Sequence, residues 1–125
     1  MTTRRLSLGD MLLVRLPQQS PPGNEQFGER PAVVVGLPEL LGPVRFPMAV
    51  IAPLTTDRGQ PWAAANPALY PRLPAGVGGL GSDSLVLLDQ VRSLGVRRIV
   101  RQIGTVPAQA LGPIQNGLLR IFSGG

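Results

Sequence analysis

The chain contains no cysteine and no histidine. Without cysteine there is no disulfide framework, no thiol nucleophile and no thiolate metal site. Without histidine, the commonest general base and the commonest metal ligand of enzymes are missing as well. These two absences exclude most catalytic mechanisms before any motif is considered, and we expect neither a bound metal ion nor another cofactor.

Lysine is also absent, since all twelve basic residues are arginine, against seven acidic residues and a formal net charge of +5. The planar guanidinium group suits phosphate oxygens, and a basic excess favours an anionic partner such as a nucleic acid. A genome-wide preference for arginine explains the missing lysines equally well. The net charge is therefore the more informative of the two observations.

Long hydrophobic runs are missing too. The longest nearly apolar stretch, residues 46–54, is far too short to cross a membrane. Residues 1–10 include two adjacent arginines, but no signal-like apolar segment follows them. We therefore expect a cytoplasmic protein with no membrane partner. With 125 residues, of which 43% are hydrophobic, the chain is expected to form one domain over residues 1–125.

Strand-length apolar segments alternate with loops rich in glycine and proline. They predict strands at residues 10–16, 30–36, 48–54, 84–89 and 98–103, with a short strand at 68–73 and a continuation at 89–94. Pro31 lacks an N–H donor, so it belongs at the start of its strand or on a sheet edge. The body of the chain is therefore expected to be mostly β.

The C-terminal tail has a helical period instead. Apolar residues recur there at Leu111, Ile114, Leu118 and Phe122. Pro113 fits the first turn of a helix, so the pattern predicts a helix over residues 113–122 with Phe122 in its core. Together the elements predict an α+β fold, a small twisted antiparallel barrel or sheet with a C-terminal helix.

The segment from Gly23 to Val34 brings a carboxylate and a guanidinium together. A loop carries Glu25, and Arg30 stands where the following strand begins. Such a pair can cleave RNA without a metal ion: the carboxylate removes the 2′-hydroxyl proton, and the arginine stabilises the charge that develops on the phosphate. The competing interpretation is a surface ion pair worth about 0–1 kcal/mol, which the local composition alone favours.

Further polar residues stand at the ends of predicted strands. Thr55 and Thr56 end the third strand and suit either a phosphate contact or a turn cap. Asp89, Gln90 and Arg92 form either an edge that contacts RNA or a partner, or a salt bridge at a strand end. Among the few aromatic residues, Phe27 is the best placed to stack on a base, because it lies in the loop beside Gln26.

Read in order, these pieces resemble the MazF/PemK family of toxin endoribonucleases over nearly the whole chain. The Glu25-to-Val35 stretch with its Arg-Pro-Ala-Val-Val sequence is the most distinctive. The matching segments are Gly9–Asp10 with the apolar strand after it, Gly23–Val35, Pro53–Thr56, Ser84–Leu94 and Ile103–Val106 with the helix that follows. Five segments in the right order and at compatible spacing make the resemblance specific.

The resemblance implies an SH3-like barrel with a C-terminal helix and a symmetric homodimer. It further implies sequence-selective, metal-independent cleavage of single-stranded RNA, inhibited by an antitoxin with a disordered segment. By position, Arg30 is the expected catalytic arginine and Glu25 the expected base. Thr55 is the first choice for the residue that binds the phosphate, and Thr56 is the second. The residues expected to contact RNA are Gln26, Phe27, Thr56, Asp89, Gln90 and Arg92.

One departure from the family pattern bears on the mechanism. Some members place an arginine two positions before the aspartate of the Asp-Gln pair, where this chain has Leu87. This favours a mechanism based on Glu25 and Arg30 over one that uses Asp89. Two other functions are considered: a non-catalytic gyrase poison resembling CcdB proteins on the same fold, and an inactive SH3-like binding module. The Gly23-to-Pro31 segment argues against the gyrase poison, and the intact set of Glu25, Arg30 and Thr55 argues against the inactive module.

Overall fold

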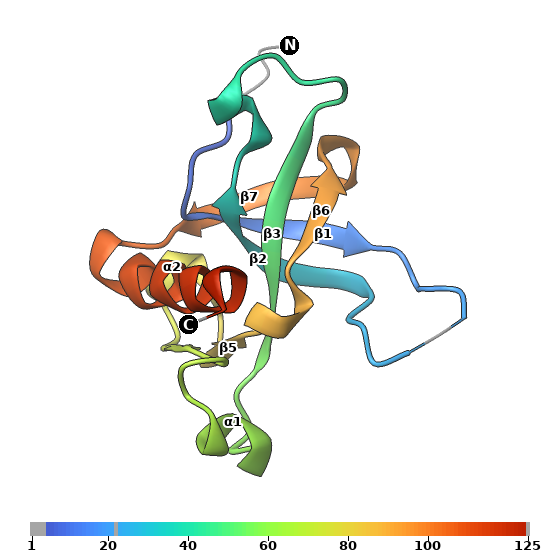
Figure 1. Cartoon of the computed structure of the whole chain (residues 1–125). Helices are drawn as coiled ribbons and strands as arrows, with labels where there is room; N and C mark the ends of the chain where they lie inside the picture. Colours follow the sequence, from blue (N-terminus) through green and yellow to red (C-terminus); the bar gives the residue numbers. More distant parts are fainter. Residues whose placement is uncertain (1–4, 22, 125) are drawn as a thin grey trace.

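A seven-stranded antiparallel sheet forms the body of the computed structural model, which describes residues 5–21 and 23–124 (Figure 1). The strands are β1 (Asp10–Leu16), β2 (Gly28–Gly36), β3 (Met48–Thr56), β4 (Arg72–Leu73), β5 (Ser84–Val86), β6 (Arg92–Gly95) and β7 (Ile99–Thr105). The helices are α1 (Pro61–Ala65) and α2 (Ala108–Ser123), with short 3-10 turns η1 (Pro38–Leu41), η2 (Val77–Gly79), η3 (Leu88–Gln90) and η4 (Val96–Arg98).

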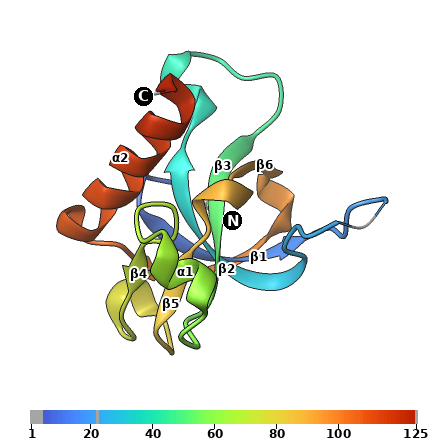
Figure 2. The same cartoon turned by 60° about the horizontal axis from the view of Figure 1, so that its bottom comes forward.

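The strand order is β4-β5-β3-β2-β1-β7, with β6 also paired to β3. Figures 1 and 2 show β1 crossing β3 steeply, so the sheet is strongly twisted. Within the described residues β4 and β7, the two ends of this path, do not pair with each other, so the sheet is open. The predicted mostly-β fold with a C-terminal helix is confirmed.

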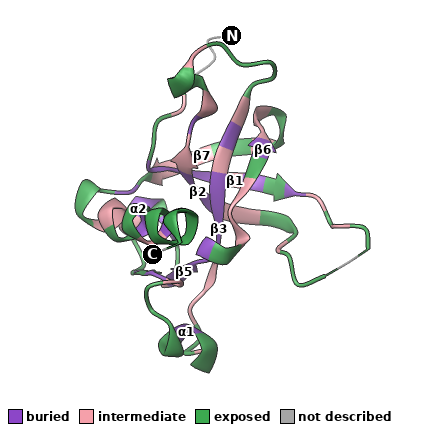
Figure 3. Ribbon diagram, viewed as in Figure 1, coloured by how far each residue is buried: buried purple, intermediate pink, exposed green. Residues whose placement is uncertain are grey.

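Both faces of the central strands are buried (Figure 3). Alternation along β2 sends Val33 into one cluster and Ala32 and Val34 into the other. The first cluster includes Ile114 and Leu118 of α2, which covers that face of the sheet. This double burial explains why β1, β2 and β3 have nearly continuous apolar sequences rather than strict polar alternation.

Strand β3 changes partners along its length. One edge pairs with β2, whereas the other pairs with β6 up to Ile51 and with β5 from Leu54 onward. Pro53, which has no N–H to donate, lies between these two segments. The change of partner also accounts for a difference from prediction: the expected strand at 84–89 ends at Val86, because β5 and β6 must pair with different halves of β3.

The C-terminal helix begins at Ala108, so the predicted start at residue 113 is wrong. Pro113 lies inside α2 rather than in its first turn. Gly112 precedes it and has no Cβ atom to collide with the proline ring, which removes part of the usual conflict between proline and the residue before it. Phe122 is not a core residue either, because it is 73% exposed; Ile114 and Leu118 carry the packing.

The segment between β3 and β5 also differs from the prediction. Of the expected strand at residues 68–73, only Arg72 and Leu73 form β4, and the preceding chain folds into α1 and a turn. Pro61 starts α1, where its fixed φ angle suits the first turn. Figures 1 and 2 both show α1 and β5 gathered at the C-terminal end of β3. In the described part of the chain, every helix is too short or too polar to cross a membrane.

The close contact of β7 with η2 gives a stability prediction. A Cβ atom at Gly104 would collide with the carbonyl group of Gly78, which is backbone and cannot turn aside. We expect Gly104→Ala to lower the free energy of unfolding by about 2 kcal/mol or more. Gly95→Ala is the matched control, since its Cβ would meet only Met48 Sδ at 3.9 Å. Urea unfolding checks this, and equal midpoints for the two variants would contradict it.

Candidate functional site

A small pocket of about 90 Å³ opens where β2 and β3 diverge. The last paired residues of the two strands are Ala32 and Pro53. Continuing the same register by two residues sets Arg30 opposite Thr55. The pocket is lined by Arg30, Pro31, Leu54, Thr55, Thr56, Leu80, Gly81, Ser82 and Ser84. The structure therefore brings together three of the residues predicted from the sequence, on two neighbouring strands.

Pro31 helps to open this pocket. It pairs with Leu13 of β1, but the pairing of β2 with β3 begins only at Ala32. Of the two places predicted for Pro31, the strand start is wrong, because β2 starts at Gly28. Locally, however, the strand has a free edge toward β3 at the residue that has no N–H to offer.

The pocket is positively charged and rich in hydroxyl groups. Arg30 is the only charged side chain in its lining. Its Nε–H donates to the carbonyl of Phe27 at 3.3 Å, and among the described residues it forms no ion pair. The terminal N–H groups are thus left to face an incoming anion. A guanidinium next to threonine hydroxyls suits the oxygens of a phosphate group.

Two serines in the lining were missed by the sequence analysis. Ser84 is buried, and its hydroxyl donates to the carbonyl of Ser82 at 2.9 Å. The signal that would have found Ser84 is its pairing with Thr56 across β5 and β3. That register cannot be deduced from the serine's local sequence, because β5 is only three residues long.

Glu25 lies in the loop between β1 and β2, only five positions before Arg30 in the sequence. In space, however, the loop does not bring the two side chains into contact. The Glu25 side chain is exposed, and its carboxylate lies against Gly23, whose lack of a side chain leaves room for it. Among the described residues no ion pair joins Glu25 to Arg30. The predicted reach of Glu25 over Arg30 is therefore not formed in this structure. Arg30 instead binds the loop backbone at Phe27.

Gln90 holds the same loop from the other side. Its Oε1 accepts a hydrogen bond from the backbone N–H of Gln26 at 3.2 Å, and its Nε2 donates to the carbonyl of Asn24 at 3.3 Å. Both polar atoms of the Gln90 side chain are thus engaged with the loop. The Oε1 atom of Gln26 is buried and has no hydrogen-bond partner among residues 5–21 and 23–124. Phe27 is 52% exposed, as a base-stacking residue must be.

In the part of the chain that the structure describes, Asp89 is bound by the hydroxyl group of Tyr70 and by no cation. The Tyr70 hydroxyl donates to Asp89 Oδ2 at 2.7 Å, and this bond raises the pKa of Tyr70 above its usual value. Tyr70 in turn meets Trp62 edge-to-face, with 4.8 Å between ring centroids. The alternative of a salt bridge at this strand end is therefore wrong for Asp89. Arg92 lies half-buried at the start of β6, opposite Ile51.

A cluster of ion pairs lies beside the pocket wall that the ends of β3 and β5 form. Arg72 donates to Asp57 at 2.6 Å and to Asp83 at 2.7 Å. Asp57 directly follows Thr56, and Asp83 directly precedes Ser84, so the cluster ties the ends of β3 and β5 together. The hydrogen bond from the Gly59 N–H, followed by that from Arg72, lowers the pKa of the Asp57 carboxyl.

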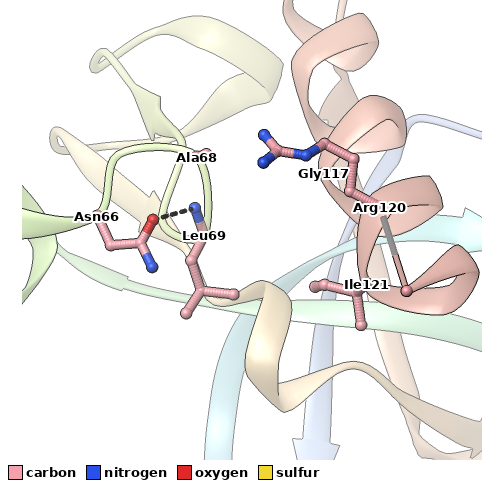
Figure 4. A pocket seen from close by; sticks show the side chains of 7 residues that line it. Asn66, Ala68, Leu69, Gly117, Arg120 and Ile121 are labelled. Atoms are coloured by element: carbon pink, nitrogen blue, oxygen red, sulfur yellow. Dashed lines mark hydrogen bonds between the residues drawn. The ribbon is translucent and has the colours of Figure 1, made fainter.

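A larger hollow of about 270 Å³ lies elsewhere, between α2 and the turn after α1 (Figure 4). Its lining residues are Asn66, Ala68, Leu69, Gly117, Arg120, Ile121 and Gly124. Arg120 is the only charged group there, and none of the predicted site residues takes part. Gly117 lets α2 approach closely, since a Cβ atom there would meet Leu88 and the Ala68 carbonyl. The chemistry predicted from the sequence belongs to the smaller pocket.

A family model described as the PemK-like, MazF-like toxin of type II toxin-antitoxin systems matches residues 7–122. The chain belongs to this family. The assignment predicted from the five sequence segments is confirmed, and the whole of the pocket and the loop beside it lies inside the matched region. Within the described residues of this MazF/PemK-family chain, no group of three acidic side chains is close enough together to hold a metal ion.

Solved structures of MazF proteins are similar to the chain over most of its length. MazF from Deinococcus radiodurans, Form-I, has a TM-score of 0.72 at 27% identity, covering 97% of this chain and 99% of that one. A MazE-MazF structure, Form-II, from the same organism gives 0.65 at 28% identity, with 96% and 97% covered. Mycobacterium tuberculosis toxin MazF-mt6 gives 0.62 at 20% identity, with 91% and 96% covered, and shows the shared fold.

The bond between Tyr70 and Asp89 predicts a measurable titration. Tyr70 is the only tyrosine of the chain, so its ultraviolet absorbance can be followed without overlap from another tyrosinate. Its raised pKa means that the folded state favours the neutral phenol. The stabilising contribution is therefore present below pH about 10 and is lost as the pH rises through the folded-state pKa. Asp89→Asn should lower the pKa of Tyr70 toward its ordinary value; an identical titration in both proteins would contradict the bond.

Proposed function

We propose that this MazF/PemK-family toxin is an endoribonuclease that cleaves single-stranded messenger RNA at selected sequences. The observation that supports the proposal is the pocket in which Arg30 lies across from Thr55, with no acidic side chain in its lining. This arrangement suits a phosphodiester, because a guanidinium group and hydroxyl donors meet where no carboxylate repels the phosphate. The net charge of +5 assists the approach of RNA from a distance.

Arg30 and Thr55 bind the scissile phosphate in this mechanism. The terminal N–H groups of Arg30 donate to the two non-bridging oxygens, and the Thr55 hydroxyl donates to one of them. Negative charge on these oxygens grows as the phosphorus becomes five-coordinate, so the donors bind the transition state more strongly than the substrate. The arginine is permanently charged, and this stabilisation needs no proton transfer.

Glu25 acts as the base. Its carboxylate turns away from Gly23 and takes the proton of the 2′-hydroxyl group, whose oxygen then attacks the adjacent phosphorus. A bond from the 2′ oxygen to phosphorus forms, the bond from phosphorus to the 5′ oxygen breaks, and the 5′ oxygen takes up a proton from solvent. The products are a 2′,3′-cyclic phosphate and a 5′-hydroxyl. No metal ion is needed, since the nucleophile is part of the substrate.

Further RNA contacts belong to the proposal. The exposed ring of Phe27 is available to stack on a base, and Thr56 lines the pocket itself. We keep Gln26 and Arg92 as proposed RNA ligands beyond the pocket. The β1–β2 loop that carries Phe27 projects from the sheet in both overall views (Figures 1 and 2). Because loops mounted on a rigid sheet commonly determine specificity, we assign the choice of RNA sequence to this loop.

The proposed partners are a second copy of the chain and an antitoxin. The Deinococcus MazE-MazF structure supports an antitoxin, and we propose one whose disordered segment folds on binding. A symmetric homodimer is supported by the apolar residues that α2 leaves exposed, Leu119, Ile121 and Phe122. The site of action is the cytoplasm, where messenger RNA is found.

The proposal predicts a loss of activity for Arg30→Ala. Purified protein is incubated with a long single-stranded RNA in EDTA, and the cut ends are mapped. We expect cleavage at a short recurring sequence with 2′,3′-cyclic ends, and a fall of about 100-fold or more in kcat for Arg30→Ala. Arg45→Ala is the control, because Arg45 lies over the Phe46 ring instead. RNA left intact by the wild type across varied sequences overturns the proposal, and a DNA supercoiling assay then tests the gyrase-poison alternative.

The two threonines are predicted to differ. Continuing the β2–β3 register past Ala32 and Pro53 places Thr55 opposite Arg30. Thr56 instead pairs with Ser84 at the end of β5. Thr55→Ala should lower kcat by about tenfold, the cost of one lost hydrogen bond to a charged group, and Thr55→Ser should restore it. Thr56→Ala should cost less. A larger loss of kcat for Thr56→Ala than for Thr55→Ala in the RNA-cleavage assay would show that the phosphate binds to the Thr56 hydroxyl.

A further inference from the structure

We propose that Gln90 is a positioning residue that clamps the backbone of the loop carrying Glu25. This inference rests on the proposed function, in which Glu25 is the base. The clamp consists of two hydrogen bonds made by one side-chain amide: its Oε1 accepts from the N–H of Gln26, and its Nε2 donates to the carbonyl of Asn24. The two bonds lie on either side of Glu25, so the backbone of the proposed base is fixed from both directions.

The backbone segment that carries Gln90 is held firmly in place. Gln90 ends η3, where its backbone N–H donates to the Leu87 carbonyl at 3.0 Å. The neighbouring Leu88 is 2% exposed and belongs to the core under α2. Asp89 is held by the Tyr70 hydroxyl. The side chain of Gln90 therefore extends from a segment that is fixed in the core, whereas the loop it holds lies on the surface.

The loop is tied on its other side by the proposed catalytic arginine. Arg30 Nε donates to the Phe27 carbonyl at 3.3 Å. The backbone from Asn24 to Phe27 is thus held at three points, two by Gln90 and one by Arg30. What stays free to move is the Glu25 side chain, which is exposed. A turn of that side chain from Gly23 toward the phosphate then needs no rearrangement of the backbone, which lowers the cost of reaching the reactive geometry.

This role differs from the one predicted from the sequence, in which Gln90 contacts RNA. An amide that reads a base must present a free donor and a free acceptor. In this structure both polar atoms of Gln90 are already bonded to the loop. A clamp affects the rate of the chemical step, because it orients the base, whereas a direct RNA contact affects binding and the choice of sequence.

The experiment combines amide hydrogen exchange with steady-state kinetics. Exchange at the Gln26 N–H is measured by NMR on the RNA-free full chain. We expect Gln90→Ala to speed this exchange about fivefold or more, the equivalent of one hydrogen bond. Gln90→Glu keeps an oxygen that accepts from Gln26 but cannot donate to Asn24, so exchange at Gln26 should stay near the wild-type rate. Gln115→Ala, an exposed glutamine on α2, is the control for both measurements.

In the kinetics, Gln90→Ala should lower kcat about tenfold with KM within a factor of about two. Unchanged exchange at Gln26 in Gln90→Ala overturns the clamp. A raised KM or an altered cleavage sequence, with kcat unchanged, overturns it as well and makes Gln90 an RNA ligand. If the wild type cuts no RNA, the proposed function fails, while the exchange comparison of Gln90→Ala with Gln90→Glu still decides whether the clamp exists.

Discussion

The whole structure depends on the requirement that β3 pair with three other strands. Along one edge it bonds to β2, and along the other it bonds first to β6 and then to β5. The pairing of β3 with β2 ends at Pro53, and the pairing with β5 begins at the next residue, Leu54. Beyond this point Arg30 and Thr55 are not joined by strand pairing. The pocket therefore lies where β3 exchanges one neighbour for another, and side chains of both strands line it.

The polar contacts around the pocket divide into two kinds. Those of Arg72 with its two aspartates fix the wall formed by the ends of β3 and β5. Those of Gln90 and Arg30 fix the loop opposite that wall. Exposed ion pairs of the first kind contribute little to stability, since solvent screens them. Their effect is geometric, because they hold the ends of β3 and β5 together within that one wall.

The sequence was most informative where a residue's environment depends on its neighbours in the chain. Strands β1 to β3 could be predicted because burial on both faces gives continuous apolar runs. The start of α2 could not, since a proline at position 113 is the usual sign of a first turn, whereas here the helix begins five residues earlier. The end of β5 at Val86 lies inside an uninterrupted apolar run, so the sequence does not mark it. It arises because β5 and β6 pair with different halves of β3. The contact between Gln90 and the loop joins residues 64 positions apart in the sequence and leaves no local signal.

The pairing of β1 with β7 has a consequence for how the protein is made. The second strand partner of β1 is nearly the last element of the chain: Gln102 donates to Asp10 at 3.1 Å, and the Val106 N–H donates to the Gly9 carbonyl at 2.8 Å. Helix α2, which seals one core, follows later still. A nascent chain can pair β1 with β2 early, but the second edge of β1 stays without its partner until β7, 92 residues beyond Asp10 at the Gln102 contact, has been made. During that interval β1 is an edge strand whose free N–H and C=O groups can pair with another strand, so the folding chain is open to mispairing along this edge.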